Sequence, residues 1–255
     1  MELGLQGKSA IVTGAASQGG IGNAIARALA AEGARLMLTD IQSEGVEELA
    51  RHLREDNCEA ISMAGDQSDL RDVQAVVAAV HQEFGGVDIL VNAAAITNNL
   101  GSVSRMEPDK WRREIDVSLT GPYFWIRETV PLMKASNWGR IVNISSTNSI
   151  FGQPGVPAYV TAKGGLNALT KQVAREVARN GITCNALVLG PIATEIYKRG
   201  VFDENAVNRM TAQIPMGRMG APDEVGSIAA FLCSRHAAFV SGALIKVDGA
   251  MSLSV

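Results

Sequence analysis

The sequence predicts an α/β fold with a doubly wound, seven-stranded parallel sheet and helices on both of its faces. Three observations support this prediction. Short apolar runs alternate with longer helical patterns, the apolar runs are continuous, and no low-complexity linker interrupts the pattern. Parallel neighbours need crossover connections, which helices supply, and strands that are covered on both faces are apolar throughout. One domain over residues 1–255 accommodates the whole pattern, because α/β domains often extend to about 250 residues.

The predicted elements follow one another closely along the chain. Seven strands are expected at 9–14, 34–40, 59–66, 87–94, 139–146, 182–190 and 243–249. Helices are expected between them at 20–32, 43–56, 68–85, 108–135 and 157–180. In such sheets, ligands bind beyond the carboxyl ends of the strands, at the point where the strand order reverses. The residues that end each strand are therefore the first candidates for a functional site.

The composition indicates a large apolar core and no electrostatic excess. Apolar residues make up 47% of the 255 residues, charged residues make up 19%, and the formal net charge is −3. Proteins that bind nucleic acid or anionic membranes mainly by electrostatics show a basic excess, so neither partner is expected. No stretch approaches the ~18 apolar residues of a membrane helix, and no signal-peptide pattern starts the chain, which predicts a cytoplasmic protein. The three distant cysteines are expected to be free thiols, without a metal site.

A glycine-rich turn follows the first predicted strand and leads into a helix. It reads TGAASQGGIG over residues 13–22. Glycines let the backbone turn tightly and approach a pyrophosphate, and the free N–H groups of the next helix N-terminus favour an anion. We therefore expect a dinucleotide here, with a plain tight turn as the alternative. The expected contacts are Gly14, Ser17, Gly20 and Ile21.

Asp40 ends the second predicted strand and bears on the choice of cofactor. A carboxylate here can accept hydrogen bonds from the 2′-hydroxyl of an adenosine ribose. It would repel a 2′-phosphate, because one charge facing a dianion at ~5 Å costs ~2 kcal/mol at a dielectric constant near 80 and ~7 kcal/mol near 20. The next residues, IQSEG, include no Arg or Lys. The sequence therefore favours NAD, with NADP less expected; a helix cap is the alternative role for Asp40.

Polar residues also end the third and fourth predicted strands. Asp66 is placed to meet the edge of an adenine, with a helix cap as the alternative. Asn92 precedes three alanines, and small residues let the chain pass close to a flat ring system; simple packing is the alternative. The neighbours Ile41, Gln67 and Ala93 complete the expected cofactor contacts.

Tyr159 and Lys163 form the most specific pattern in the chain, early in a predicted helix. Residues at i and i+4 share one helix face, and Ser146 ends a strand that points at the same cleft. Hydride transfer at a nicotinamide requires a proton to move on the neighbouring oxygen. An ammonium ~5 Å from a phenol is worth ~3 kcal/mol at a dielectric constant near 20, or ~2.4 pKa units. We therefore expect a Tyr159 pKa near ~7.5, suited to a general acid/base, while the Ser146 hydroxyl holds the substrate oxygen.

These residues resemble the short-chain dehydrogenase/reductase family, and the resemblance extends from SAIVTG to the terminal IKVDGAMSL. It implies a Rossmann-type fold and an oxidoreductase that acts on CH–OH groups with a nicotinamide cofactor. It implies that Tyr159 is the acid/base, that Ser146 orients the substrate oxygen, and that Lys163 lowers the Tyr pKa and binds the nicotinamide ribose. The segment NALVLGPIAT would place the Ile192 backbone at the carboxamide and Thr194 at the phosphates.

The chain departs from the family pattern at several positions. Its glycine turn is longer than usual, and it reads NAAA where members often read NNAG. The most consequential departure is Ser118 in DVSLTG, where the family commonly has an asparagine that completes a catalytic tetrad. In that role a main-chain carbonyl holds a water that links the lysine to solvent. Ser118 keeps the carbonyl, so we expect the proton relay to survive.

A polar, partly helical segment over about 193–215 stands where a substrate lid would lie. Such lids exclude water and select substrate. Thr147 and Asn148 directly follow Ser146, so we expect them to flank the reacting carbon, with Tyr197 contributed by the lid. Capping of the loop backbone is the alternative role for Thr147 and Asn148.

Three functions remain open at this stage. The first is an NAD-linked oxidoreductase for a small-molecule secondary alcohol or its ketone. The second is a 3-oxoacyl thioester reductase, which would use NADPH; Asp40 and the acidic pI of 5.7 count against it. The third is a dinucleotide-binding regulator without turnover, against which the intact Ser146, Tyr159 and Lys163 argue. The family resemblance also implies a homotetramer or homodimer, built on the long helices near 117–135 and 158–180.

Overall fold

Seven strands form one parallel sheet in the order β3-β2-β1-β4-β5-β6-β7. The computed structural model describes residues 2–96, 99–198 and 203–253. The strands are β1 Ser9–Thr13, β2 Arg35–Asp40, β3 Ala60–Ala64, β4 Ile89–Asn92, β5 Gly139–Ser146, β6 Ile182–Leu189 and β7 Leu244–Val247. The order runs outward in both directions from the neighbours β1 and β4, so the strand order reverses between these two. The prediction of a doubly wound, seven-stranded parallel sheet is confirmed.

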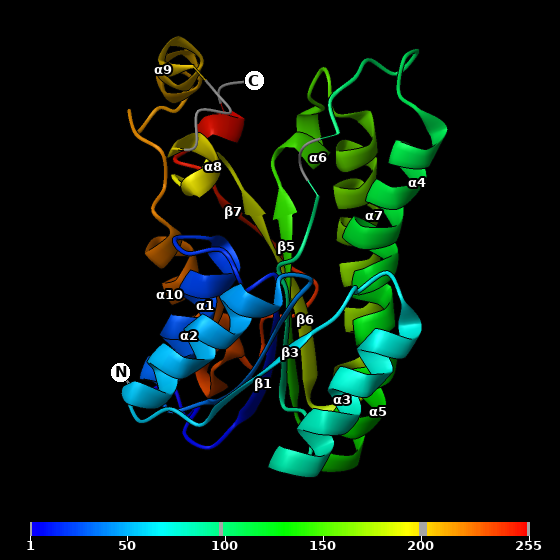
Figure 1. The fold of residues 1–255 in the computed structure, drawn as a ribbon, viewed down its shortest axis with the longest axis vertical. Helices are drawn as coiled ribbons and strands as arrows, with labels where there is room; N and C mark the ends of the chain where they lie inside the picture. The colour runs from blue at the N-terminus through cyan, green and yellow to red at the C-terminus, as the bar shows by residue number, and fades with distance from the viewer. Residues whose placement is uncertain (1, 97–98, 199–202, 254–255) are drawn as a thin grey trace.

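Helices cover both faces of the sheet, as Figure 1 shows. One layer contains α1, α2 and α10, and the other contains α3, α5 and α7 (Figure 1). The longer helices are α1 Ile21–Ala31, α2 Ser43–Glu55, α3 Leu70–Phe84, α4 Pro108–Ile115, α5 Gly121–Ser136, α7 Pro157–Val177, α9 Glu204–Ala212 and α10 Pro222–Cys233. The short helices are α6 Asn148–Phe151, α8 Glu195–Lys198, a π-helical turn Asp116–Thr120, and 3₁₀ turns at Ala178–Asn180, Arg235–Ala237 and Met251–Leu253.

The continuous apolar strands divide their side chains between two cores. In β1, Ile11 packs with the layer that contains α3, α5 and α7, while Ala10 and Val12 pack with the layer that contains α1 and α10. This alternation follows from the period of two along a strand. Both faces of the central strands are therefore buried, which explains why the sequence shows no polar alternation.

The structure differs from the predicted elements in two places. The helix expected over 108–135 is interrupted by the π-helical turn Asp116–Thr120. The helix α10 was not predicted, although Pro222 at its first turn and Asp223 beside it are start signals. Its N-terminus is closed by Glu224, whose carboxylate accepts a hydrogen bond from the Ala221 amide at 2.7 Å.

The carboxyl ends of the strands meet at one end of the molecule, under α6, α8 and α9 (Figure 1). The segment expected as a lid lies there, although residues 199–202 fall outside the described residues. Directly after it, the chain is joined to the C-terminal segment, because the Met216 amide donates to the Gly249 carbonyl at 3.3 Å. The three cysteines carry free thiols, with Cys184 and Cys233 buried and Cys58 half-buried. No helix of the described chain is long and apolar enough to cross a bilayer.

Candidate active site

A cavity of about 300 Å³ lies beyond the carboxyl ends of β1 to β4. Residues from all four strand ends line it, which is where a doubly wound sheet binds its ligand. The lining includes Gly14, Ser17, Asp40, Ile41, Asp66, Gln67, Ala93 and Arg113. Seven of these eight residues are expected cofactor contacts. The sequence analysis did not single out Arg113.

The glycine turn after β1 is held against the loop after β4. The Thr13 hydroxyl accepts hydrogen bonds from the amides of Ala93 and Ala94 at 3.0 and 3.1 Å. Gly14 has a φ of +68°, and a Cβ placed there would lie 2.6 Å from the Ala94 nitrogen. The sequence predicts that the glycines of this turn let the backbone approach a pyrophosphate. At Gly14 the structure adds a second requirement, which is the close approach of two loops.

The N-terminus of α1 faces this turn without a side-chain cap on its Gly20 N-cap. An uncapped helix start leaves N–H groups and a partial positive charge for an anion. Ile41, at the opposite side of the cavity, is an apolar side chain with 65% exposure. An exposed apolar side chain beside polar strand ends suits the flat face of an adenine. Because of these two features, the residues present fit a dinucleotide whose pyrophosphate would lie near α1 and whose adenosine would lie near the end of β2.

Asp40 ends β2, and its carboxylate is engaged by the backbone. One oxygen accepts from the Gln42 amide at 3.1 Å, and the other accepts from the Ala16 amide at 3.3 Å. The carboxylate thus ties the glycine turn to the start of α2. Asp40 is not the N-cap of α2, because that position is Gln42 and the helix has no side-chain cap; the carboxylate lies in the cavity wall.

Asp66 is joined to α4, the helix that precedes the π-helical turn. Its carboxylate pairs with the Arg113 guanidinium at 2.7 Å and accepts from the Ser68 amide and hydroxyl. Burial alone would raise the pKa of Asp66, but the hydrogen bonds from Arg113 and Ser68 leave it lowered overall. Asp66 is thus an ionised residue at the cavity wall, and its predicted contact with adenine stays a prediction.

The side chains of Gln67 and Asn92 make hydrogen bonds to other segments of the protein. Gln67 donates to the carbonyls of Ala94 and Val117 at 3.2 and 2.6 Å, and it accepts from the Trp125 indole at 3.3 Å. Asn92 donates to Asn143 on the neighbouring strand β5 at 2.8 Å. A cofactor contact at Gln67 is therefore left to its backbone. At Asn92 the side-chain oxygen has no hydrogen-bond partner within the described chain.

Ser146, Tyr159 and Lys163 come together where β5 ends and α7 begins. Ser146 is the last residue of β5, and Tyr159 is the third residue of α7. The Lys163 ammonium lies 5.7 Å from the centroid of the Tyr159 ring. It donates to the Ile144 carbonyl of β5 at 2.7 Å, which fixes α7 against the sheet. Strand end and helix face thus meet as the spacing of the motif predicts.

The pKa of Tyr159 differs from the sequence-based expectation. Burial raises the pKa of Tyr159 to about 12, and a hydrogen bond with Ser146 only partly offsets this. Burial also lowers the pKa of Lys163 to about 8. The expected value near ~7.5 is therefore wrong for this structure, because it counted the attraction of the ammonium and left out desolvation of both charged forms. At neutral pH Tyr159 carries its proton.

A buried carboxylate that the sequence analysis did not single out lies near this group. Glu114, on α4, is 1% exposed, and its charge acts on both Lys163 and Tyr159. Burial raises the pKa of Glu114, while a hydrogen bond from Asn99 and the charge of Lys163 oppose the rise. One helical turn later, Ser118 is fully buried in the π-helical turn, and its hydroxyl accepts from the Ile96 amide at 3.3 Å. Single π turns inside α-helices are frequent at functional sites.

The residues after Ser146 are held mainly by the loop itself. The Thr147 hydroxyl donates to the Leu189 carbonyl at 3.2 Å, so the backbone-capping alternative describes this side chain. The Asn148 amide donates to the Ser146 hydroxyl at 3.2 Å. Ser149 donates to the Ser146 carbonyl at 2.5 Å. The loop thus fixes both polar groups of Ser146 that could otherwise rotate or shift.

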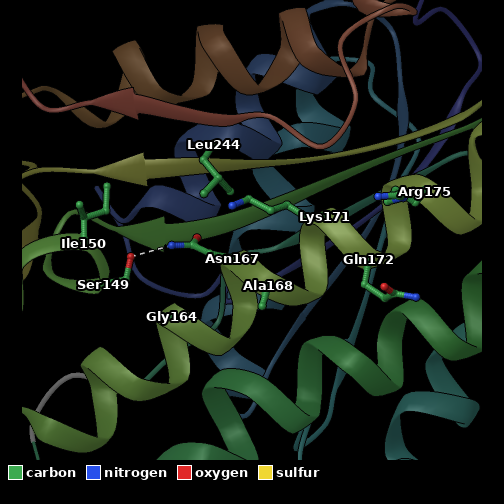
Figure 2. A pocket seen from close by; sticks show the side chains of 9 residues that line it. All are labelled: Ser149, Ile150, Gly164, Asn167, Ala168, Lys171, Gln172, Arg175 and Leu244. Carbon is green, nitrogen blue, oxygen red and sulfur yellow. Dashed lines mark hydrogen bonds between the residues drawn. The ribbon is translucent and has the colours of Figure 1, made fainter.

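A second cavity, of about 470 Å³, lies outside this loop against α7 and β7. Figure 2 shows Asn167, within this cavity, pointing at Ser149, to which it donates a hydrogen bond at 2.8 Å. Since Ser149 in turn donates to the Ser146 carbonyl, a chain of two hydrogen bonds runs from α7 to the backbone of Ser146. Two residues that line this cavity, Asn167 and Ser149, therefore hold the Ser146 backbone in place. The cavity itself does not lie at the strand ends that border the first cavity.

The segment after β6 contributes Ile192, Thr194 and Tyr197. Ile192 is buried, and its carbonyl accepts from the Thr194 amide at 2.7 Å. Tyr197, on α8, lies close enough to Tyr159 to influence its pKa. Burial raises the pKa of Tyr197 as well. The structure therefore brings Tyr197 to the catalytic group, and α8 also lies over the glycine turn, since Glu195 approaches Gly19.

Comparison with known proteins defines the class to which this site belongs. The model of a family described as enoyl-(acyl carrier protein) reductase matches residues 14–252. The chain is 36% identical to a 3-oxoacyl-(acyl-carrier-protein) reductase of Vibrio cholerae, over 98% of this chain and 99% of the relative. It is 35% identical to the reductases of the same name from Aquifex aeolicus, over 98% and 100%, and Pseudomonas aeruginosa, over 99% and 100%.

The fold, the strand-end cavity and the grouping of Ser146, Tyr159 and Lys163 are those of a nicotinamide-dependent oxidoreductase. The chain belongs to the short-chain dehydrogenase/reductase family. It is an oxidoreductase of that family.

These relatives correct the cofactor prediction. They carry the name of the reductase for which the sequence analysis expected NADPH, so the assignment of NAD, with NADP less expected, is wrong. The expected repulsion holds for an Asp40 carboxylate that faces the ribose as a bare charge. In the structure, two backbone N–H groups share that charge, from Ala16 and Gln42. Hydrogen bonds to a carboxylate spread its charge, so the repulsion of a 2′-phosphate was overstated.

Proposed function

We propose that this chain reduces a 3-oxoacyl thioester to the 3-hydroxyacyl thioester, with NADPH as the hydride donor. Two observations support the proposal. The relatives named above carry this activity in their names, and Tyr159, with its pKa raised to about 12, is a protonated acid at neutral pH. A protonated phenol can give a proton to a carbonyl oxygen that is gaining negative charge, which is the reductive direction.

The chemistry needs one hydride and one proton for each carbonyl. The bound dinucleotide would supply the hydride to the carbonyl carbon. In our proposal Tyr159 supplies the proton to the carbonyl oxygen, while the Ser146 hydroxyl donates a hydrogen bond to the same oxygen. Lys163 keeps a positive charge near the phenol, so that the phenolate left after proton transfer is stabilised until solvent restores the proton.

The proposed cofactor contacts follow the cavity at the strand ends. The start of α1, with Gly14, Ser17, Gly20 and Ile21, would hold the pyrophosphate. The ends of β2 to β4 would hold the adenosine. Lys163 and the segment of Ile192 and Thr194 would hold the nicotinamide half.

The proposed substrate contacts surround the phenol. Asn148 and Tyr197 stay candidates for the thioester side, and the segment over about 193–215 stays a proposed lid.

A half-exposed Tyr123 on α5 supports a further proposal, that two copies associate through α5 and α7. Size-exclusion chromatography with light scattering tests that association, and a monomer at micromolar concentration would contradict it.

The decisive experiment measures nicotinamide oxidation with a panel of carbonyl compounds. Acetoacetyl-CoA and longer 3-oxoacyl thioesters are offered with NADPH and, in parallel, with NADH. Simple cyclic and open-chain ketones serve as the control panel. The proposal expects kcat/KM for a 3-oxoacyl thioester with NADPH to exceed that for every simple ketone by at least ~10-fold. Equal or better reduction of simple ketones would contradict the substrate class, and faster turnover with NADH would contradict the cofactor.

A further inference from the structure

We propose that Glu114 is the counter-ion of Lys163, a buried carboxylate that keeps the ammonium charged and in place beside Tyr159. Glu114 is a positioning residue in this account, because it acts on the reaction through Lys163. The inference deepens the proposed reductase function and rests on it. It assigns a role to a residue that no motif of the sequence marks.

The environment of Glu114 is unusual for its helix. The sequence of α4, PDKWRREI, is polar, and Glu114 is its only buried residue. Its Oε1 atom has no hydrogen-bond partner within the described chain. An isolated carboxylate is costly to bury unless a partner compensates its charge. Since α4 packs directly against α7, the helix that carries Lys163 is the element from which that compensation comes.

Lys163 is a buried cation whose charge its hydrogen-bond partner does not balance. Its side chain is 2% exposed, and the hydrogen bond that the structure gives its ammonium is the one to the Ile144 carbonyl. An ammonium has three donors, and a neutral carbonyl does not balance its charge. The Glu114 charge raises the pKa of Lys163, and the Lys163 charge lowers the pKa of Glu114. The attraction is therefore mutual and acts across the interface of two helices.

The other charged groups near α4 do not provide this partner. Arg113 is paired with Asp66, and Arg112 is paired with Asp109, on the outside of the helix. Within the described residues, the groups that the structure places at Lys163 and Glu114 from the packed elements are the Ile144 carbonyl of β5, the Tyr159 phenol of α7 and the Asn99 side chain. The Tyr197 phenol of α8 acts on Tyr159. None of these carries a negative charge at neutral pH, so Glu114 is the group among the described residues there that can balance the ammonium.

The position of Glu114 gives the inference a structural reason. Glu114 lies one helical turn before Ser118. Position 118 is the one where the family commonly has an asparagine. This chain has a serine at position 118 and a carboxylate on the preceding turn. A carboxylate carries a full negative charge, so it attracts the ammonium through space, which an uncharged amide does much less.

The first test is the pH profile of the reductase. Removing the charge in Glu114→Gln should lower the pKa of Lys163 further, so the alkaline limb of kcat moves to lower pH by about one unit. The KM for the thioester should stay within twofold. Glu114→Asp should return the limb toward the wild-type position. The control is Glu107→Gln, which removes an exposed carboxylate at the start of the same helix. An unmoved limb in Glu114→Gln would overturn the proposal.

The second test does not depend on any substrate. Thermal unfolding is measured at neutral pH for Glu114→Gln, Lys163→Met and the double variant. Glu114→Gln should lower Tm when Lys163 is present, because the ammonium loses its counter-ion. In the Lys163→Met background, the same change should raise Tm, because the carboxylate is then buried alone. A shift of the same sign in both backgrounds would refute the pairing.

The two tests separate failure of this inference from failure of the proposed function. If no 3-oxoacyl thioester is reduced but the sign of the Tm shift reverses, the pairing stands and the proposed substrate is wrong. If the thioester is reduced and neither the pH limb nor the sign of the Tm shift responds, Glu114 is not the counter-ion.

Discussion

The Lys163 ammonium lies 5.7 Å from the centroid of the Tyr159 ring and is anchored to the Ile144 carbonyl at 2.7 Å. One side chain therefore lies beside the phenol and is bonded to the strand that ends in Ser146. Because both ionisable groups are buried, each is shifted toward its neutral form, to a pKa of about 12 for Tyr159 and about 8 for Lys163. The site at rest holds a protonated acid beside a cation that loses its proton just above neutral pH.

The first prediction concerns the phenol. Tyr159→Phe removes the transferable proton and keeps the ring, so kcat should fall by ~10³-fold, within the range that general acid catalysis supplies. NADPH binding, followed by nicotinamide fluorescence, should stay within about twofold. The matched control is Tyr123→Phe on the exposed side of α5, which should leave kcat unchanged. A Tyr159→Phe enzyme with more than a tenth of the wild-type kcat would refute proton donation by Tyr159.

The second prediction concerns the pH dependence that Lys163 imposes. Its folded-state pKa of about 8 lies below the ordinary value of 10.5, so the folded protein binds fewer protons than the unfolded chain between these two pH values. Stability should therefore rise with pH across that window, while kcat for reduction should fall as the ammonium loses its proton.

Both effects should disappear together in Lys163→Met. Differential scanning calorimetry from pH 7 to 10 follows the first effect, and the kcat profile follows the second. If the Tm of Lys163→Met rises with pH as steeply as that of the wild type, another group is responsible for the rise.

The sequence predicted the sheet well and the energetics of the site less well, for different reasons. Strands such as β5 and β6 are apolar over their whole length, and that pattern depends only on local residues. The Tyr159 pKa and the burial of Glu114 depend on how α4 and α7 pack. A polar helix such as α4 is typical of an exposed element, so no local pattern could indicate that one of its carboxylates is 1% exposed.

The same division explains the side chains of Thr147 and Gln67. Both are polar residues at strand ends, where the sequence places a ligand. Their hydrogen bonds go instead to Leu189, to Ala94 and to Val117, on segments that are distant in the sequence. Strand-end position predicted which residues border the cleft. It could not predict which of these residues use their polar side-chain atoms for hydrogen bonds to backbone carbonyls of the protein itself.

The third prediction tests the contact between the glycine turn and the loop after β4. Gly14→Ala combines a φ of +68° with a Cβ only 2.6 Å from the Ala94 nitrogen. We expect a loss of about 3 kcal/mol or more, which corresponds to roughly 6–12 °C in Tm for a chain of this size. Gly85→Ala is the matched control, because its φ is +81° and nothing lies within 4 Å of the added Cβ.

The control should lose only about 1–2 kcal/mol, since it pays for the backbone conformation alone. Equal losses in the two variants would show that the turn can move away from Ala94. The NADPH affinity of Gly14→Ala should also fall, because the same turn borders the cofactor cavity.

The fourth prediction concerns Asp40 and the proposed use of NADPH. Asp40→Asn keeps an acceptor for the Ala16 or Gln42 amide but removes the negative charge. A charge facing a dianion at ~5 Å is worth ~2 kcal/mol at a dielectric constant near 80, or roughly 30-fold in affinity. Because the Ala16 and Gln42 amides share the charge of Asp40, the kcat/KM for NADPH should rise by less than this, by about 3- to 10-fold. Glu44→Gln, which removes an exposed charge from the first turn of α2, should change it by less than twofold. No rise in Asp40→Asn would place the 2′-phosphate away from β2.

The fifth prediction separates the hydroxyl of Ser118 from its backbone. The hydroxyl accepts from the Ile96 amide, so Ser118→Ala leaves a part-buried N–H group without that partner and should cost about 1 kcal/mol of stability. The carbonyl stays in the π-helical turn, so kcat should fall by less than ~10-fold and its pH profile should keep its shape. A ~100-fold loss of kcat would show that the hydroxyl itself is essential.

Ser118→Asn tests the same residue from the other direction. The site is fully buried, so the larger amide should overpack it and lower Tm, at a cost of about 1–3 kcal/mol. If the main-chain carbonyl of residue 118 is the functional group, folded Ser118→Asn should keep kcat within ~10-fold of the wild type. The reason is that serine and asparagine present the same backbone carbonyl in this turn. A stable Ser118→Asn enzyme with a kcat far above the wild type would show that the serine limits the proton relay.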